Sequence, residues 1–312
     1  MKKCRSLTLF FFLILVLSLL VSCDGNGSGS VYTVTFLSED GDVLSSQTYG
    51  DGAYVSPPDA EEKPSEIFIG WYREESDTAY DFSAPVRSDM TLTARYRIDY
   101  ESLTNRITGE MMTANFTVET RHYRTPYSYD TSIASGVVIE RSGDTCFLLT
   151  NCHNTKKSGY LYAEYFVTDC YGNRFTATLN SFDDSYDLAV LFFTAEKEYS
   201  VVKLAESNTK PDTVVAAVGQ PGGQRNALTY GRTKAYRSLG ESDGEESAVM
   251  FDVLLHTAPT DHGSSGGALL DPELRLVGLN FAVLRDREGE FLYTAAIPAE
   301  KIAEYLESHP FY

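Results

Sequence analysis

Short β-strand patterns recur at close intervals from residue 111 onward, and this recurrence limits the fold more than any other feature of the chain. Runs of β-branched and aromatic residues are separated by turn sequences such as Ser142-Gly143-Asp144. A first set of runs covers residues 115–120, 134–139, 146–151, 161–167, 174–180 and 188–194. A second set covers residues 213–218, 229–235, 247–255, 268–270, 274–282 and 291–296. Two sets of about six short strands predict two small β-barrels in tandem.

Residues 298–306 change from strand patterns to helical periodicity. Pro298 stands at an early position, apolar residues follow at 302, 305 and 306, and charged residues occupy other positions. Proline is tolerated in the first turn of a helix, and this apolar spacing places one face against a core. We therefore expect a helix to follow the second barrel.

The first thirty residues predict an export signal and a tether. Basic residues at positions 2, 3 and 5 precede an apolar run over residues 7–21, which is short for a membrane span but typical of a secretory signal. The run ends in Leu-Val-Ser-Cys at residues 20–23, which resembles a bacterial lipobox. The resemblance implies cleavage before Cys23, lipid on its sulfur and, in many bacteria, acylation of its new amino group. The alternative is an uncleaved hydrophobic anchor.

Charge excludes one class of partner. The 44 Asp and Glu residues outnumber the 26 Lys and Arg residues, which gives a formal net charge of −18. Such a charge disfavours nucleic acid and is repelled by an anionic lipid surface. Membrane attachment would therefore depend on lipid at Cys23, and we expect an extracytoplasmic, lipid-anchored bacterial protein at the cell surface or in the periplasm.

Residues 31–97 form a separate pattern of short strands broken by prolines. An opening strand at 31–36, Phe-Ile-Gly-Trp-Tyr at 68–72, Tyr-Asp-Phe at 80–82 and a closing strand from Leu92 resemble one Listeria–Bacteroides repeat. The resemblance implies a small β-grasp-like module that serves as a spacer or an adhesive element. Trp71 is the only tryptophan and is expected to anchor a small core, with ligand stacking as the alternative.

A Gly-x-Ser-Gly-Gly sequence around Ser265 indicates a nucleophilic serine. Such a serine reacts only if a base and an orienting carboxylate reach it. His153 follows one apolar segment and Asp187 opens another, although Asp183 and Asp184 compete for the place of the acid. The order His, Asp, Ser is that of the chymotrypsin-like arrangement and differs from the subtilisin and α/β-hydrolase orders. The sequence therefore predicts a serine protease.

Each predicted catalytic residue has a separate task. The His153 imidazole would take the proton of the Ser265 hydroxyl and return it to the leaving amine, while Asp187 would hold the other ring N–H. The backbone N–H groups of Gly263 and Ser265 would form an oxyanion hole, which is worth about 3–4 kcal/mol per donor in comparable enzymes.

Further segments resemble the trypsin-like domain of the Deg, or high-temperature-requirement (HtrA), serine proteases. They are Ser-Gly-Val-Val-Ile at 135–139, Leu-Thr-Asn-Cys-His at 149–153, Asp-Leu-Ala-Val-Leu at 187–191, 217–223, 263–270, 277–280 and 296–298. The resemblance implies a mainly β, chymotrypsin-like double six-stranded β-barrel with a C-terminal helix, behind the β-grasp-like domain. It also implies endopeptidase activity with His153, Asp187 and Ser265 as the triad and with no cofactor or metal. Ser264 and Cys152 stand where the family usually has Asn, residues 121–131 look like an insertion, and no PDZ domain is expected.

The expected domains follow from these patterns. They are a signal at 1–22, a tether at 23–30, the repeat at 31–97, a linker at 98–110 and the trypsin-like domain at 111–312.

Two groups of residues are expected to bind substrate. Leu279, Asn280 and Phe281 would form the strand that pairs with the substrate backbone. Thr260 and His262, just ahead of the nucleophile, would wall the specificity pocket. Pro259 and Asp261 would help to form the same wall. His262 and Asp261 could favour a polar side chain in the substrate, whereas the family resemblance implies a small aliphatic one. The expected substrates are unfolded or surface proteins and peptides.

Three cysteines remain beyond the signal and Cys23. If residues 146–152 form one strand, Cys146 and Cys152 lie too far apart for a disulfide. Pairing of Cys170 with either one stays open, and small buried thiols are the alternative. The spacing does not favour a zinc site.

Two other functions compete with the protease. The repeat and the expected lack of a PDZ domain would suit a catalytically silent surface adhesin or scaffold. An enzyme whose oxyanion loop orders only on binding a partner is the third possibility. Oligomeric state does not follow from the sequence.

Overall fold

The computed structural model describes residues 29–240 and 249–311. The export signal, Cys23 and the start of the predicted 247–255 strand lie outside the described residues. The described chain divides into two compact units, one of residues up to Asp59 with Trp71–Ala94, and one of Ala60–Gly70 with the residues from Arg95 onward. The predicted domain limits stay predictions. Among the described residues, none of the helices has the length and apolarity that a membrane crossing requires.

A four-stranded sheet forms the N-terminal part, in the order β2-β1-β4-β3. Its strands are β1 (Val31–Leu37), β2 (Val43–Gly50), β3 (Glu66–Tyr72) and β4 (Met90–Ile98). β1 pairs with β2 antiparallel and with β4 parallel. Trp71 is 3% exposed, and its ring meets Phe36 edge-on at 4.8 Å. Phe82 stacks on Phe36 at 6.2 Å, so the tryptophan anchors a small aromatic core as predicted.

The predicted linker contains a helix. Asp99 caps α1 (Tyr100–Arg106) by accepting from the Ser102 backbone N–H at 3.1 Å. The helix continues as η1 (Ile107–Met111) and η2 (Met112–Ala114). Leu103 and Ile107 are fully buried in the core of the second unit.

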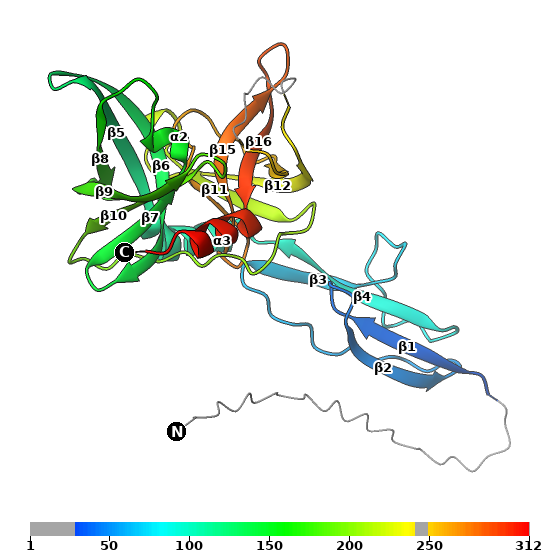
Figure 1. Cartoon of the computed structure of the whole chain (residues 1–312). Helices are drawn as coiled ribbons and strands as arrows, with labels where there is room; N and C mark the ends of the chain where they lie inside the picture. The colour runs from blue at the N-terminus through cyan, green and yellow to red at the C-terminus, as the bar shows by residue number, and fades with distance from the viewer. Residues whose placement is uncertain (1–28, 241–248, 312) are drawn as a thin grey trace, which may run out of the picture. The chain divides into compact units, whose positions relative to one another are not determined.

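Two closed six-stranded barrels make up the rest of the second unit (Figure 1), as the strand patterns predicted. The first has the order β10-β7-β6-β5-β8-β9. Its strands are β5 (Asn115–Thr125), β6 (Ser128–Ser142), β7 (Thr145–Thr150), β8 (Tyr162–Thr168), β9 (Arg174–Asp183) and β10 (Leu188–Thr194). Barrel closure leaves no free sheet edge.

The second barrel has the order β11-β12-β13-β16-β15-β14. Its strands are β11 (Val214–Gly219), β12 (Ala227–Arg237), β13 (Val253–His256), β14 (Ala268–Leu270), β15 (Leu276–Arg285) and β16 (Phe291–Pro298). The short helix η3 (Pro221–Gly223) follows β11, and α3 (Ala299–Ser308) follows β16. The predicted closing helix is therefore confirmed.

One apolar core joins the two barrels. Val138 and Leu149 of the first barrel belong to the same buried cluster as Val218 and Leu279 of the second. Tyr305 of α3 is also fully buried in this cluster. The strand ends of both barrels are thereby held rigidly against each other, which is the condition for a site built from both.

Residues 121–131, expected to be an insertion, extend β5 and β6 into a long hairpin. The strands pair as far as Thr125 and Ser128. Tyr123 stacks on Tyr162 of β8 at 4.5 Å, so the extension is packed against a third strand.

Candidate active site

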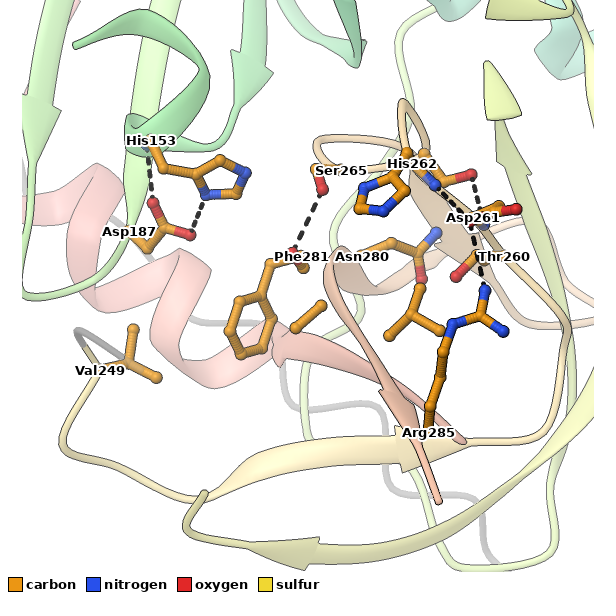
Figure 2. A pocket seen from close by; sticks show the side chains of 13 residues that line it. His153, Asp187, Val249, Thr260, Asp261, His262, Ser265, Asn280, Phe281 and Arg285 are labelled. Atoms are coloured by element: carbon orange, nitrogen blue, oxygen red, sulfur yellow. Dashed lines mark hydrogen bonds and ion pairs between the residues drawn. The ribbon is translucent and has the colours of Figure 1, made fainter. Parts of the chain in front are cut away.

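His153 and Asp187 meet at the edge of the first barrel. His153 lies in α2 (Cys152–Thr155), the single turn of helix that follows β7, and Asp187 immediately precedes β10. The His153 Nδ1 atom lies 2.7 Å from Asp187 Oδ2, and the His153 backbone N–H donates to Asp187 Oδ1 at 2.9 Å (Figure 2). Asp187 is only 7% exposed. The carboxylate can therefore fix both the position and the tautomer of the ring.

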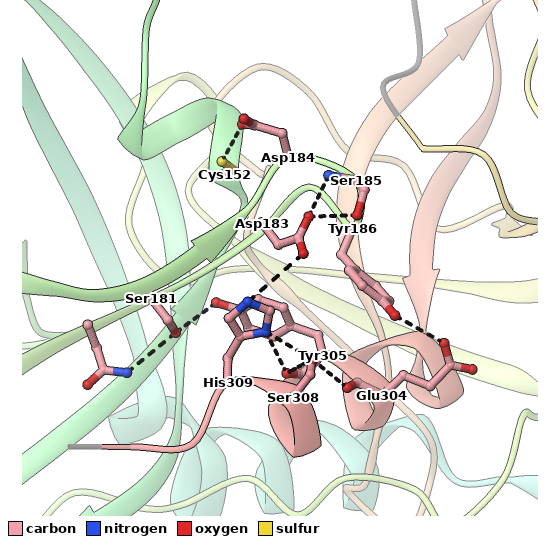
Figure 3. A network of polar contacts seen from close by, with 11 residues as sticks. Cys152, Ser181, Asp183, Asp184, Ser185, Tyr186, Glu304, Tyr305, Ser308 and His309 are labelled. Atoms are coloured by element: carbon pink, nitrogen blue, oxygen red, sulfur yellow. Dashed lines mark hydrogen bonds and ion pairs between the residues drawn. The ribbon is translucent and has the colours of Figure 1, made fainter.

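The competing carboxylates have other partners (Figure 3). Asp184 accepts from the Cys152 thiol at 3.0 Å and from Lys156 Nζ at 3.2 Å, and these bonds hold its pKa below the usual range. Asp183 accepts from Ser185, through both its backbone N–H and its hydroxyl. Of the three aspartates, only Asp187 contacts the His153 ring among the described residues.

The Cys152 side chain is a buried, protonated thiol. Burial raises its pKa, and the hydrogen bond to the Asp184 carboxylate raises it further. Cys146 and Cys170, like Cys152, are free thiols. Among the residues that the structure covers, no group of three or more His, Cys, Asp or Glu side chains could hold a metal ion.

Ser265 lies in a turn between β13 and β14. Gly263 and Gly266 have φ of +96° and +82°, a region that favours glycine. A Cβ atom on Gly266 would clash with the Ser135 carbonyl oxygen, so the turn packs closely against β6. The Ser265 hydroxyl donates to the Phe281 carbonyl at 3.2 Å and has no hydrogen bond to His153.

One cavity of about 420 Å³ is lined by His153, Asp187 and Ser265 together. The structure therefore brings the three predicted catalytic side chains to one site. A catalytic hydrogen bond between serine and histidine is often absent until substrate binds, so the present Ser265 rotamer is compatible with the predicted role.

The backbone N–H groups of Gly263 and Ser265 donate none of the hydrogen bonds found within the described chain. The carbonyls across the same peptide bonds are both used: His262 O accepts from Gly222 N–H at 2.7 Å, and Ser264 O accepts from Gly267 N–H at 2.9 Å. In a trans peptide the C=O and N–H point in opposite directions. Each N–H group is thus turned away from the partner of its carbonyl.

Most of the predicted substrate-binding residues line the cavity. Thr260, His262, Asn280 and Phe281 all do so. Leu279 does not, and this placement corrects the prediction. It is fully buried, and its backbone pairs with Ala268 on one side and Ile297 on the other.

Other residues of the cavity wall were not predicted. They are Val249, Ala282, Val283 and Arg285. Alternation along a strand places 281, 283 and 285 on one face, and this pattern was available in the sequence. Arg285 Nη2 lies 3.3 Å from Asp261 Oδ1 at the cavity.

A buried polar pair supports Asn280. The Asn280 Oδ1 atom lies 2.9 Å from His256 Nε2, and both residues are at most 1% exposed. Burial lowers the pKa of His256 to about 4, so its ring is neutral at neutral pH. The neutral tautomer with the proton on Nε2 donates to Asn280.

Two family models match the chain in tandem. A Listeria–Bacteroides repeat domain matches residues 32–95, and a trypsin-like peptidase domain matches residues 134–279. The first range covers most of the N-terminal sheet, and the second covers the two barrels apart from β5, β16 and parts of β6 and β15.

Curated relatives are bacterial and animal serine proteases. A probable periplasmic serine endoprotease, DegP-like, from Buchnera aphidicola subsp. Schizaphis graminum is 27% identical over 178 residues, which are 56% of this chain and 35% of the relative. The periplasmic serine endoprotease DegP of Escherichia coli strain K12 is 26% identical over 55% of this chain and 34% of its own length. The chain spans about a third of the length of these relatives.

A solved structure of an HtrA-type protease with a tripeptide shares the fold. It superposes with a TM-score of 0.53 at 25% identity, over 66% of this chain and 63% of that one. Each of these relatives is itself named as a serine protease or an HtrA-type protease. The chain thus contains a trypsin-like peptidase domain, homologous to the HtrA and DegP serine proteases, together with a Listeria–Bacteroides repeat nearer its N-terminus.

Proposed function

We propose that this chain is an extracytoplasmic serine endopeptidase in which Ser265 is the nucleophile, His153 the general base and Asp187 the orienting acid. The observation that carries the proposal is the pair of short hydrogen bonds between His153 and Asp187, in a cavity that Ser265 also lines. The homologous DegP and DegP-like proteins are described as periplasmic endoproteases, which supports the location and the substrate class.

The reaction follows the triad template. On substrate binding, the Ser265 hydroxyl exchanges its bond to the Phe281 carbonyl for one to His153 Nε2. The oxygen then attacks the scissile carbonyl carbon while its proton moves to the imidazole, and Asp187 stabilises the imidazolium. Collapse of the tetrahedral intermediate breaks the C–N bond, and the imidazolium gives its proton to the departing amine. Water, deprotonated by His153, hydrolyses the acyl-enzyme.

Two free backbone N–H groups would bind the scissile carbonyl oxygen of the substrate, which becomes negatively charged in the tetrahedral intermediate. Gly263 and Ser265 supply them, and both belong to a turn whose carbonyls are held by hydrogen bonds. Donors that are oriented in advance stabilise the transition state more than the planar substrate, so this arrangement raises kcat.

The bulge in β15 would bind the substrate backbone. Pairing with β16 shifts register between Asn280 and Ala282, so Phe281 has no partner there. A polypeptide in extended conformation can add to such a segment through main-chain bonds. Folded domains rarely offer an extended free strand, and we therefore propose unfolded or flexible protein segments as substrates.

Lipid attachment at Cys23 completes the proposal. Its support is the sequence resemblance to a lipobox, which would place the enzyme on a bacterial membrane at the cell surface or in the periplasm.

Turnover of an unfolded protein tests the proposed function. The chain from residue 24 onward is purified and incubated with fluorescently labelled casein. Wild type is expected to cleave casein, and Ser265→Ala is expected to lose many orders of magnitude of activity. A matched control, Ser238→Ala, removes an exposed serine hydroxyl that does not line the cavity and should cleave normally. Absence of casein cleavage by folded wild type would favour the silent adhesin or the partner-activated enzyme.

A further inference from the structure

The Ser135 side chain connects three segments around the nucleophile, although the proposed reaction does not use it. It lies in β6 and is fully buried. Its Oγ atom donates to the Gly263 carbonyl at 2.7 Å and accepts from the Gln220 backbone N–H at 2.9 Å. One hydroxyl thus joins the first barrel, the loop after β11 and the turn that carries Ser265.

The Ser135 backbone holds the same turn at a second point. Its N–H donates to the Ser265 carbonyl at 2.8 Å, and its carbonyl accepts from the Thr150 hydroxyl at 2.7 Å. The carbonyls of Gly263 and Ser265 are therefore both bonded to Ser135. The peptide that supplies the Ser265 N–H lies between these two fixed points.

Glycine makes the turn dependent on such bonds. Gly263 has φ of +96°, and a residue without Cβ reaches other backbone conformations at low steric cost. Hydrogen bonds to the neighbouring carbonyls must then select the conformation. The loop at Gln220, which donates to Ser135 Oγ, also contains Gly222, whose N–H holds the His262 carbonyl. Loss of the hydroxyl would release the Gly263 carbonyl and the Gln220 N–H, while the Ser265 carbonyl would keep its bond to the Ser135 backbone.

We infer that Ser135 is a positioning residue whose hydroxyl keeps the N–H groups of Gly263 and Ser265 aligned for the oxyanion. The inference rests on the proposed role of Ser265. Ser135 touches neither the substrate nor the reacting atoms, and it acts by fixing the peptides that do. Its effect should therefore fall on the transition state and leave ground-state binding of the substrate unchanged.

Ser135→Ala tests this inference, with Thr233→Val as a matched control. Thr233 is also a fully buried hydroxyl that bridges two backbone groups, since its Oγ1 donates to Lys210 O at 2.7 Å and accepts from Thr213 N–H at 3.0 Å. Neither bond involves the turn. For each variant we would measure kcat and KM on a peptide ester, the inhibition constant of a peptide aldehyde, whose adduct places an oxyanion in the hole, and the Tm.

Ser135→Ala is expected to lower kcat at least about tenfold with KM unchanged, given that removal of a direct oxyanion donor costs about 10²- to 10³-fold. The aldehyde should bind more weakly by a similar factor. Thr233→Val should lower the Tm but leave kcat and aldehyde binding near the wild-type values. Ser135→Thr, which keeps a hydroxyl, should recover part of the lost kcat.

Three outcomes would overturn the inference. Wild-type kcat in Ser135→Ala would exclude a positioning role while leaving the proposed function intact. An equal loss of kcat in Thr233→Val would show a general effect of lost stability. Inactive, folded wild type would reject the proposed function and the inference with it.

Discussion

Asp187 combines a buried carboxylate with a left-handed backbone, and its neighbours fix both. Its φ is +50°, and its carbonyl accepts from Asn151 Nδ2 at 3.0 Å and from the Cys152 N–H at 3.1 Å. The two residues that follow β7 thus hold the acid beside His153. The sequence order alone indicated the pair, but the backbone conformation that forms it depends on these long-range bonds.

Replacement of the Asp187 carboxylate by an amide removes the negative charge and keeps the shape of the side chain. Asp187→Asn should keep the fold and lower kcat by about 10⁴-fold, because the amide favours the wrong tautomer of the base. Asp184→Asn is the matched control, since that side chain faces Cys152 and Lys156 and should leave kcat within about threefold. Steady-state kinetics on one peptide substrate compare the two variants. An equal loss of kcat in both would contradict the assignment of the acid.

His256 should make the fold sensitive to acid. Burial lowers its pKa from 6.5 to about 4, so the unfolded chain binds a proton at a higher pH than the folded chain. The free energy of unfolding is therefore unaffected above about pH 6.5 and falls as the pH drops toward 4, by about 3 kcal/mol in total from this group.

Urea unfolding at several pH values measures this contribution. His256→Gln removes the titrating group and keeps a donor for Asn280, so its free energy of unfolding should fall less steeply between pH 6.5 and 4 than that of wild type. Parallel pH profiles for the two proteins would show that His256 does not carry the effect.

At the scale of elements, α3 fastens the loop that leads to Asp187. Tyr305 is fully buried, and its hydroxyl lies 2.9 Å from Ser181 Oγ at the end of β9. Tyr186, next to Asp187, donates to Glu304 on the same helix at 3.4 Å (Figure 3). The helix therefore supports the acid loop as well as the core.

Truncation of Tyr305 should be costly. Tyr305→Ala removes a buried ring and is expected to lower the free energy of unfolding by about 3–5 kcal/mol. Tyr305→Phe keeps the ring and loses only the hydrogen bond to Ser181, so the loss should be about 1 kcal/mol. Guanidinium unfolding of both variants checks the difference. A loss below 1 kcal/mol for the alanine variant would contradict the role of α3 as a core element.

Strand positions were predicted better than strand ends. Residues 188–194 and 268–270 match β10 and β14 because apolar runs between turn residues mark short buried strands clearly. β5 and β6 run further than predicted. Their ends are polar and rich in tyrosine, so they lack an apolar strand pattern, and they are strands because each is paired with the other. Such a register is a long-range property that local patterns do not contain.

In the site, too, features carried by local sequence were predicted, and features that depend on long-range contacts were not. His153, Asp187 and Ser265 stood out because each type of side chain has a chemical task. Leu279 was misplaced because the bulge that exposes Phe281 arises from pairing with β16. Ser135 was noticed only as part of a family motif, because its hydrogen bonds reach across the barrel interface.

At the scale of the whole molecule, the account includes a lipid anchor. Cys23→Ser removes the proposed site of lipid attachment. The protein expressed in a bacterium should therefore shift from the membrane fraction to the soluble fraction, because stable anchoring depends on the acyl chains. Cys170→Ser, which alters a thiol of the first barrel, serves as the control and should stay with the membrane. Detergent phase partitioning and metabolic labelling with a fatty acid provide the readouts. Unchanged labelling of Cys23→Ser would reject the anchor.

The repeat then has a simple mechanical interpretation. A small sheet with its own aromatic core, between the predicted anchor and the peptidase domain, can space the enzyme from the membrane. The formal net charge of −18 favours solubility and adds repulsion from anionic lipid.

The most direct test of the central claim is covalent labelling of the protein from residue 24 onward by a fluorophosphonate, followed by intact mass measurement and peptide mapping. We predict one adduct per chain, located at Ser265, and no adduct in Ser265→Ala or after unfolding of the wild type. A folded wild-type sample that takes up no label, or takes it up at another residue, would contradict the claim that Ser265 is an activated nucleophile.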